Sequence, residues 1–304
     1  MRRAAAIDVG TNSVRLYVAE LADGKRIEVE RDLVITRMGE GVDASGSLGD
    51  DALRRTVEAV ADYHRHARDA EADVVRIAAT SAVRDSHDRD RFVAAVRDAT
   101  GVVPEILTGE QEARCSFLGA VDELEGPGPF LVVDVGGGST EFVRGSRTVE
   151  AWISLDVGSV RLTERHIRHD PPSEEELAGV GRDADAAVDQ AKKAVGDGPA
   201  NLVGLAGTAT TLAAVSLGLR NYDRDRIHHA VLGIDEIGRM TAELGRMTND
   251  QRRRLPVMPP GREDVIVAGA VILLRVMEGF GSSEMIVSES DLLDGLVLTL
   301  SGDA

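Results

Sequence analysis

A short glycine-rich segment carries the residue types best suited to phosphate chemistry. Residues 134–141 read Asp-Val-Gly-Gly-Gly-Ser-Thr-Glu, and the four residues before them are apolar. Consecutive glycines after a strand allow a sharp turn whose backbone N–H groups approach an anion closely. Asp134, at the end of the strand, can hold a hard cation directly or through water. The segment predicts a phosphate-binding turn. If the pattern occurred only once in the chain, an ordinary glycine-rich hairpin would be the favoured interpretation.

The same layout occurs near the start of the chain. A strand-like run over 4–9 leads into Asp8-Val9-Gly10-Thr11-Asn12-Ser13, and 14–21 then alternates between apolar and polar residues as a half-buried strand does. Asp8 and Asp134 are 126 residues apart. Two strand–turn–strand units predict a duplicated α/β domain whose two turns face each other across a cleft.

Two further strand ends carry groups that could contact an anion. The predicted strand 74–79 ends in Thr80 and Ser81, with Arg84 just beyond, and the run 202–206 enters a helix through Gly207 and Thr208. Ligands of open α/β sheets bind at the carboxyl ends of strands, and helix N-termini attract anions. A helix cap and a surface arginine explain Thr80 to Arg84 equally well.

One carboxylate stands out as a candidate base. After a short strand over 103–107, a helix runs toward residue 123, with Glu112 in its first turn and the small residues Ser116 and Gly119 on the same face. This helix links the two halves, which predicts Glu112 near the mouth of the cleft. An acid in the first helical turn commonly just complements the helix dipole, and this is the plainer interpretation.

Composition limits the functional classes. The chain has 304 residues, 43% of them hydrophobic, which is enough for two globular domains. Its N-terminal apolar run is too short for a signal sequence or a membrane span, so a cytoplasmic protein is expected. A single cysteine, Cys115, excludes an internal disulfide. The net charge of −17 disfavours nucleic acid and anionic membranes as partners, so an anionic substrate must be captured locally.

The clearest boundary is the Gly/Pro-rich stretch 125–129, which predicts domains over 1–125 and 126–304. The helix expected over 291–301 is a candidate to pack back on the first domain. Other expected elements are a loop over 39–50, helices over 51–70, 174–195 and 262–280, a strand and turn over 152–161, and a strand over 285–288. Basic groups either guide a polyanion or lie on solvated faces; they are Arg220, Arg224, Arg226, His228, His229 and Arg252 to Arg254.

Four motifs together resemble the exopolyphosphatase/guanosine pentaphosphate phosphatase family, in the family's order and spacing. They are residues 8–13, 79–84, 109–114 and 134–141. The resemblance implies the actin-like ATPase fold, with two ribonuclease-H-like domains flanking a cleft, and hydrolytic release of terminal phosphate. The chain is similar to the short form, which lacks a C-terminal His/Asp-type domain. It departs from the pattern at Gln111, Pro259 and Ser290.

The resemblance also implies roles for individual residues. Glu112 would be the general base that activates water, supported by Arg84. Asp134 would be the first metal contact, followed by Asp8 and Glu141, with Mg²⁺ or Mn²⁺ as the ion. A homodimer is implied as well. The implied phosphate-binding residues are Gly10, Thr11, Asn12, Ser13, Thr80, Ser81, Gly136, Gly137, Gly138, Ser139, Gly207 and Thr208.

Several functional interpretations compete. Exopolyphosphatase activity is the main expectation, with a preference for short polyphosphates because no further domain follows the last helix to extend a binding channel and the net charge is acidic. A guanosine pentaphosphate 5′-phosphohydrolase would use the same loops and base. A kinase or ATPase of the same fold would need an acceptor or partner, and a non-catalytic polyphosphate- or nucleotide-binding regulator would bind without releasing phosphate.

Overall fold

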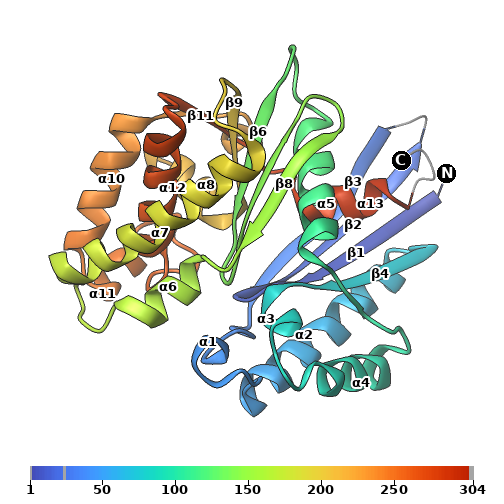
Figure 1. Cartoon of the computed structure of the whole chain (residues 1–304). Helices are drawn as coiled ribbons and strands as arrows, with labels where there is room; N and C mark the ends of the chain where they lie inside the picture. Colours follow the sequence, from blue (N-terminus) through green and yellow to red (C-terminus); the bar gives the residue numbers. More distant parts are fainter. Residues whose placement is uncertain (1, 23–24, 301–304) are drawn as a thin grey trace. The chain divides into compact units, whose positions relative to one another are not determined.

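The computed structural model describes residues 2–22 and 25–300 (Figure 1). The chain divides into two compact units. Unit 1 contains the residues up to Gly119 and those from Leu292 onward, and unit 2 runs from Ala120 to Asp291. Each unit is built on its own sheet, and each is described by itself below.

The sheet of unit 1 has the strand order β3-β2-β1-β4-β5. The pairs β3–β2 and β2–β1 are antiparallel, whereas β1–β4 and β4–β5 are parallel. Since β1 and β4 are parallel, the turn after β1 and the segment after β4 leave the sheet at the same edge. The bounds are β1 Arg2–Val9, β2 Ser13–Ala22, β3 Lys25–Ile35, β4 Val74–Ala79 and β5 Glu105–Ile106.

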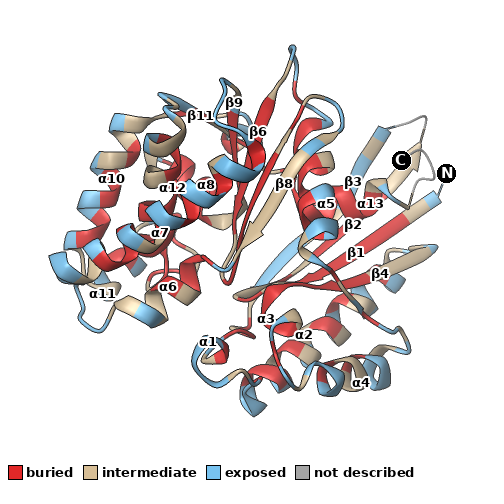
Figure 2. Ribbon diagram, viewed as in Figure 1, coloured by how far each residue is buried: buried red, intermediate tan, exposed pale blue. Residues whose placement is uncertain are grey.

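The two faces of this sheet are covered by different helices, because side chains alternate along each strand. On β1, Ala5, Ile7 and Val9 pack in a core with α2 (Asp50–Asp69) and α4 (Arg89–Thr100). The alternate residues Ala4 and Ala6 pack with α13 (Leu292–Leu298). Figure 1 shows α2 and α4 on one side of the sheet, and Figure 2 shows β1 buried along most of its length.

Helix α13 is held by close packing and by buried charge. A Cβ at Gly295 would lie 1.9 Å from the carbonyl oxygen of Cys115, so only glycine permits this approach to α5 (Gly109–Val121). The carboxylate of Asp294 pairs with Arg31 at 2.9 Å and with Arg26 at 3.4 Å. Four apolar side chains of α13 are buried, and each contributes about 1.5–3 kcal/mol through burial; they are Leu292, Leu293, Leu296 and Val297.

The sheet of unit 2 has the order β10-β11-β9-β6-β7-β8, which repeats that of unit 1 with β10 added at one edge. Here β8–β7 and β7–β6 are antiparallel, and β6–β9 and β9–β11 are parallel. The repeated order confirms the predicted α/β fold of two ribonuclease-H-like units, as in the actin-like ATPase fold. The bounds are β6 Phe130–Val135, β7 Thr140–Gly145, β8 Val149–Leu155, β9 Asn201–Leu205, β10 Val231–Gly233 and β11 Glu284–Val287.

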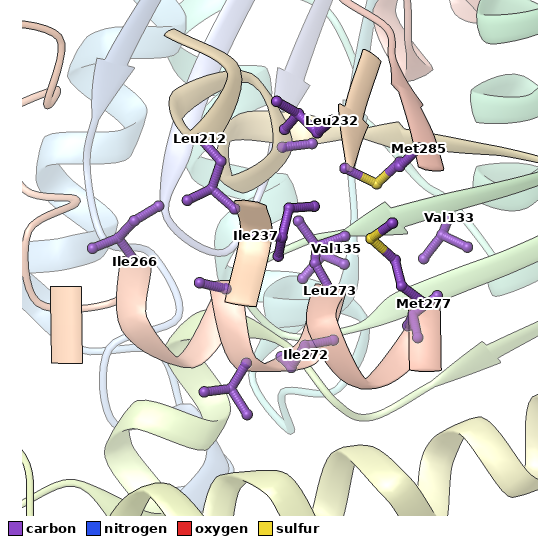
Figure 3. Close-up of a cluster of buried hydrophobic side chains, with 14 of the residues drawn as sticks. Val133, Val135, Leu212, Leu232, Ile237, Ile266, Ile272, Leu273, Met277 and Met285 are labelled. Atoms are coloured by element: carbon purple, nitrogen blue, oxygen red, sulfur yellow. The ribbon is translucent and has the colours of Figure 1, made fainter. Parts of the chain in front are cut away.

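One face of this sheet packs against an almost wholly apolar helix. Helix α12 (Ile266–Phe280) contacts α7 (Glu174–Val195) and α10 (Ile234–Arg246), and its residues Ile272 and Leu273 are buried. Figure 3 shows these side chains with Val133 and Val135 of β6 and with Leu212 of α8 (Ala206–Ser216). The odd-numbered residues of β6 therefore face the core, and Asp134 lies on the other face.

Most expected elements are present, with several corrections. The stretch expected as a turn before 161 is already helical, because α6 (Ser159–His166) begins at Ser159. The helix expected from 262 begins at Ile266, and the strand expected over 103–107 is reduced to β5. Helices α4 and α10 were not predicted, and part of the stretch expected as a loop over 39–50 forms the short helix α1. The remaining helices are α1 Val42–Ser45, α3 Ser81–Arg84, α9 Arg224–Ile227 and α11 Asn249–Arg253.

None of the helices within 2–22 and 25–300 combines the length and the apolar character needed to cross a membrane.

Candidate phosphate-binding and catalytic residues

The turn of unit 1 joins β1 to β2. The N–H of Gly10 donates to the carbonyl of Ser13 at 2.9 Å. Two carbonyls of the turn accept from the segment that follows β3: Thr11 accepts from Gly39 at 2.8 Å, and Asn12 accepts from the N–H groups of residues 36 and 37. In the described part of the chain, the N–H groups of Thr11 and Asn12 donate to no carbonyl, so both can bind an anion.

Asp8 precedes this turn and is held by an arginine. Its cross-strand neighbour on β2 is Arg15. Arg15 donates to Oδ2 of Asp8 from Nη2 at 2.7 Å and from Nε at 3.0 Å. The Asp8 side chain is 4% exposed, so this is a largely desolvated ion pair in which the guanidinium balances the carboxylate.

The segment after β4 meets the turn, as the parallel pairing requires. Thr80 donates its N–H to the carbonyl of Val9, and the hydroxyls of Thr11 and Ser81 lie 2.9 Å apart in a buried hydrogen bond. The carbonyl of Thr80 accepts from the N–H of Arg84, which closes the single turn of α3. Within unit 1, the structure therefore brings Thr80 and Ser81 to the first glycine turn.

Glu112 is joined to Arg84. Nη1 of Arg84 lies 2.7 Å from Oε2 of Glu112 and 3.2 Å from the carbonyl of Leu107. Glu112 sits in the first turn of α5, where its N–H donates to Thr108, and its side chain is 9% exposed. A guanidinium anchored on a backbone carbonyl fixes the orientation of this carboxylate, which a positioned proton acceptor requires.

The turn of unit 2 joins β6 to β7 and is held at three successive carbonyls. The N–H of Gly136 donates to Ser139 at 3.0 Å, as at the equivalent position in unit 1. The carbonyls of Gly136, Gly137 and Gly138 all accept from the start of α6. Within the residues that the structure describes, no carbonyl accepts from the N–H groups of Gly137, Gly138 or Ser139.

Two carboxylates flank this second turn. Asp134 and Glu141 are direct cross-strand neighbours, so their side chains lie on the same face of the sheet. Both are buried, and Glu141 accepts a hydrogen bond from Ser154 at 2.7 Å. Among residues 2–22 and 25–300, no group of three or more His, Cys, Asp or Glu side chains is arranged as a metal site. Two carboxylates nevertheless suit Mg²⁺, which keeps several waters and also binds substrate phosphates.

Gly207 and Thr208 lie at the same sheet edge as Asp134, because β9 runs parallel to β6 with Leu205 opposite Asp134. Helix α8 starts at Ala206, which has a φ of 63°. Gly207 leaves room for an arginine, since a Cβ there would lie 1.3 Å from Nη1 of Arg262. Sequence reasoning missed Arg262, and no local pattern connects it to Gly207.

Two of the basic groups considered as a polyanion guide, Arg252 and His228, have structural partners. Arg252 is 2% exposed and donates to the carbonyls of Leu244 and Met247 at the end of α10. His228 lies 2.8 Å from the carboxylate of Glu123 and accepts the N–H of Glu289 on its other ring nitrogen. These two residues serve the fold of unit 2 and do not form a path for a polyanion.

The candidate residues thus form two groups, one in each unit. Comparison with known proteins gives them a family. The Ppx/GppA phosphatase family matches residues 17–303. The chain belongs to this family. It is 42% identical to Exopolyphosphatase 2 of Mycobacterium tuberculosis over 99% of both chains. It is also 26% identical to guanosine-5′-triphosphate,3′-diphosphate pyrophosphatase of Photobacterium profundum, over 96% of this chain and 58% of that protein.

Solved structures of Ppx/GppA relatives have the same fold. The crystal structure of an exopolyphosphatase-like protein has a TM-score of 0.93 and 35% identity, with 99% of both chains covered. The Ppx/GppA protein of Aquifex aeolicus has a TM-score of 0.84 and 33% identity, over 100% of this chain and 99% of that one. The family predicted from four short motifs is therefore confirmed over nearly the whole chain.

Proposed function

We propose that this protein is an exopolyphosphatase that releases terminal orthophosphate from inorganic polyphosphate. The observation that carries the proposal is the 2.7 Å ion pair between Arg84 and Glu112, which orients a largely buried carboxylate in a phosphatase of this family. The similarity to Exopolyphosphatase 2 supports polyphosphate as the substrate.

In the proposed reaction, Glu112 accepts a proton from a water molecule whose oxygen attacks the terminal phosphorus. The new P–O bond forms opposite the bridging P–O bond, which breaks and leaves its electron pair on the shortened chain. Phosphoryl transfer depends mainly on positioning and charge stabilisation. Within each unit, the amides of the glycine turn are neutral donors that suit phosphate oxygens. Arg84 holds the Glu112 carboxylate in place.

The residues around the second turn fit a divalent cation. Asp134 and Glu141 would hold Mg²⁺ or Mn²⁺, and the ion would neutralise phosphate charge in a protein of net charge −17. Asp8 is a weaker candidate, because Arg15 already balances its charge through two hydrogen bonds.

The test is phosphate release from a panel of substrates by the purified protein. The panel contains short and long polyphosphates of defined length, guanosine pentaphosphate and ATP, at fixed Mg²⁺ and ionic strength. We expect polyphosphate to have the highest kcat/KM, with short chains preferred because the acidic field opposes each phosphate that no loop holds. Faster turnover of guanosine pentaphosphate would instead favour the activity named for the Photobacterium relative.

Glu112→Gln tests the proposed base. It keeps the shape of the side chain and its acceptor oxygen but removes the proton acceptor, so kcat should fall about a hundredfold or more while substrate binding persists. Glu110→Gln is the matched control, because Glu110 lies on the same helix and pairs with the exposed Arg114. Near-normal turnover of folded Glu112→Gln would remove Glu112 from this role.

The proposal includes a homodimer, which the family resemblance implies, and a cytoplasmic location, which the sequence predicts. Light scattering on the purified protein measures its mass, and a value of one chain would contradict the dimer. Fractionation of the source cells tests the location.

A further inference from the structure

Arg161 holds the glycine turn of unit 2 from two directions. Its backbone N–H donates to the carbonyl of Gly137 at 3.0 Å, and its side-chain Nε donates to the next carbonyl, Gly138, at 2.7 Å. The residues before it complete the set: Val160 donates to Gly137 at 2.9 Å, and Ser159 donates to Gly136 from its N–H at 2.9 Å and from its hydroxyl at 3.2 Å.

These contacts determine which way the turn amides point. In a trans peptide the C=O and the following N–H point in opposite directions. When α6 binds the carbonyls of Gly136, Gly137 and Gly138, the N–H groups of the next residue in each case are directed away from α6. Those groups belong to Gly137, Gly138 and Ser139, and consecutive amides on one side form a concave anion-binding nest.

The approach of α6 to the turn is close. A Cβ at Gly158 would lie 2.4 Å from the carbonyl oxygen of Gly137 and 2.7 Å from the nitrogen of Gly138. Among the contacts of the described residues, the carbonyls of Gly136 and Gly137 accept from backbone N–H groups, whereas that of Gly138 accepts from the Arg161 side chain. A charged donor also makes a stronger hydrogen bond than a neutral one.

We infer that Arg161 is a positioning residue for the phosphate site: it fixes the peptide between Gly138 and Ser139 so that the amides of the turn converge on a phosphate group. The inference rests on the proposed function for its substrate. Its geometry lies within unit 2 and does not depend on Glu112.

The test compares Arg161→Ala with Arg165→Ala. Arg165 lies one turn further along α6 and pairs with Asp183 at 2.9 Å, so its removal takes the same charge from the same helix without touching the turn. We expect Arg161→Ala to raise KM for polyphosphate about tenfold, the size of one charge-assisted hydrogen bond. The value of kcat should change much less, since the turn holds ground state and transition state alike.

A second measurement does not need turnover. Orthophosphate titrated into ¹⁵N-labelled wild-type protein should shift the amide signals of Gly137, Gly138 and Ser139, and these shifts should weaken in Arg161→Ala and persist in Arg165→Ala. Should Arg161→Ala fail to fold, Arg161→Lys carries the test, because lysine keeps the charge but has no donor at the Nε position.

The outcomes separate the two proposals. If wild type releases no phosphate from polyphosphate, yet shows the three amide shifts and they weaken in Arg161→Ala but not in Arg165→Ala, the proposed function is wrong and this inference is supported. An active wild-type protein in which Arg161→Ala and Arg165→Ala have the same KM and the same amide shifts overturns the inference and keeps the proposed function.

Discussion

The two glycine turns share one backbone plan but differ in the residue beside the aspartate. Each turn follows a buried aspartate and closes with the same hydrogen bond, from Gly10 to Ser13 and from Gly136 to Ser139. The cross-strand partner of Asp8 is Arg15, whereas that of Asp134 is Glu141. One pair sums to zero charge and the other to −2. The two units share the geometry of the turn. The residue at one cross-strand position gives the two turns different charge.

The turns also differ in how they are held. In unit 1, two carbonyls accept from backbone groups of the loop after β3. In unit 2, three successive carbonyls accept from the first turn of α6, one of them through the Arg161 side chain. The second turn is therefore the more tightly specified of the two, and it is the one beside the carboxylate pair. Unit 2 thus combines the more tightly held turn with the two carboxylates that we propose as cation ligands.

The largest expected difference between the turns concerns metal dependence. Asp134→Asn should lower kcat on the order of a hundredfold or more and raise the Mg²⁺ concentration needed for half-maximal rate. Asp8→Asn should leave that Mg²⁺ concentration nearly unchanged, because the Asp8 carboxylate is already ion-paired with Arg15. Mg²⁺ titrations of the initial rate, with melting curves as folding controls, measure both. If the Mg²⁺ concentration for half-maximal rate rose equally in both variants, the two turns would not differ in metal dependence.

The cross-strand partners should have opposite effects on stability. Arg15→Gln should destabilise the protein by about 1–3 kcal/mol, because the buried Asp8 carboxylate loses a charged donor. Glu141→Gln should be neutral or stabilising in metal-free buffer, since it removes a like charge facing Asp134 and keeps an acceptor for Ser154. Urea unfolding with and without Mg²⁺ measures this, and wild type should gain more from Mg²⁺ than Glu141→Gln does. Destabilisation by both substitutions in metal-free buffer would contradict the assignment.

The sequence revealed those features that are encoded locally. Both turns were predictable because aspartate, glycine and flanking apolar runs lie within a few residues of each other and recur. Glu112 and the Thr80–Ser81 segment were found through short motifs. The pairing of Glu112 with Arg84, in contrast, requires α3 and α5 to meet at the edge of the unit 1 sheet, which residue spacing does not reveal.

The features that were missed depend on register and on tertiary packing. Arg15 reads as one polar residue in an alternating strand, and only the register opposite Asp8 gives it a role. Arg161 was assigned to a turn, whereas it belongs to the first turn of α6, where it reaches Gly138. Arg262 contacts Gly207 because α8 and the segment before α12 pack together. Arg15 contacts its partner across a strand pair, and Arg161 and Arg262 contact residues that are distant in sequence.

The smallest expected difference compares a glycine beside each turn. A Cβ at Gly158 would lie 2.4 Å from the backbone oxygen of Gly137, whereas a Cβ at Gly39 would lie 2.2 Å from the side-chain methyl of Thr11. A methyl group can rotate away, but a backbone carbonyl moves only with its peptide. Gly158→Ala should therefore displace the second turn and lower kcat/KM about tenfold, an overpacking cost of roughly 1.4 kcal/mol.

Gly39→Ala should cost less, because rotation of Thr11 gives up only its hydrogen bond to Ser81 and leaves the first turn closed. Phosphate release and melting temperature, measured on both variants side by side, compare the two turns directly. Adding Thr11→Ser to Gly39→Ala removes the methyl group but keeps the hydroxyl, so the double variant should recover activity. No single side-chain truncation should rescue Gly158→Ala, since its clash is with the main chain. If Gly39→Ala lowered phosphate release more than Gly158→Ala did, the first turn would be the one that is more sensitive to displacement.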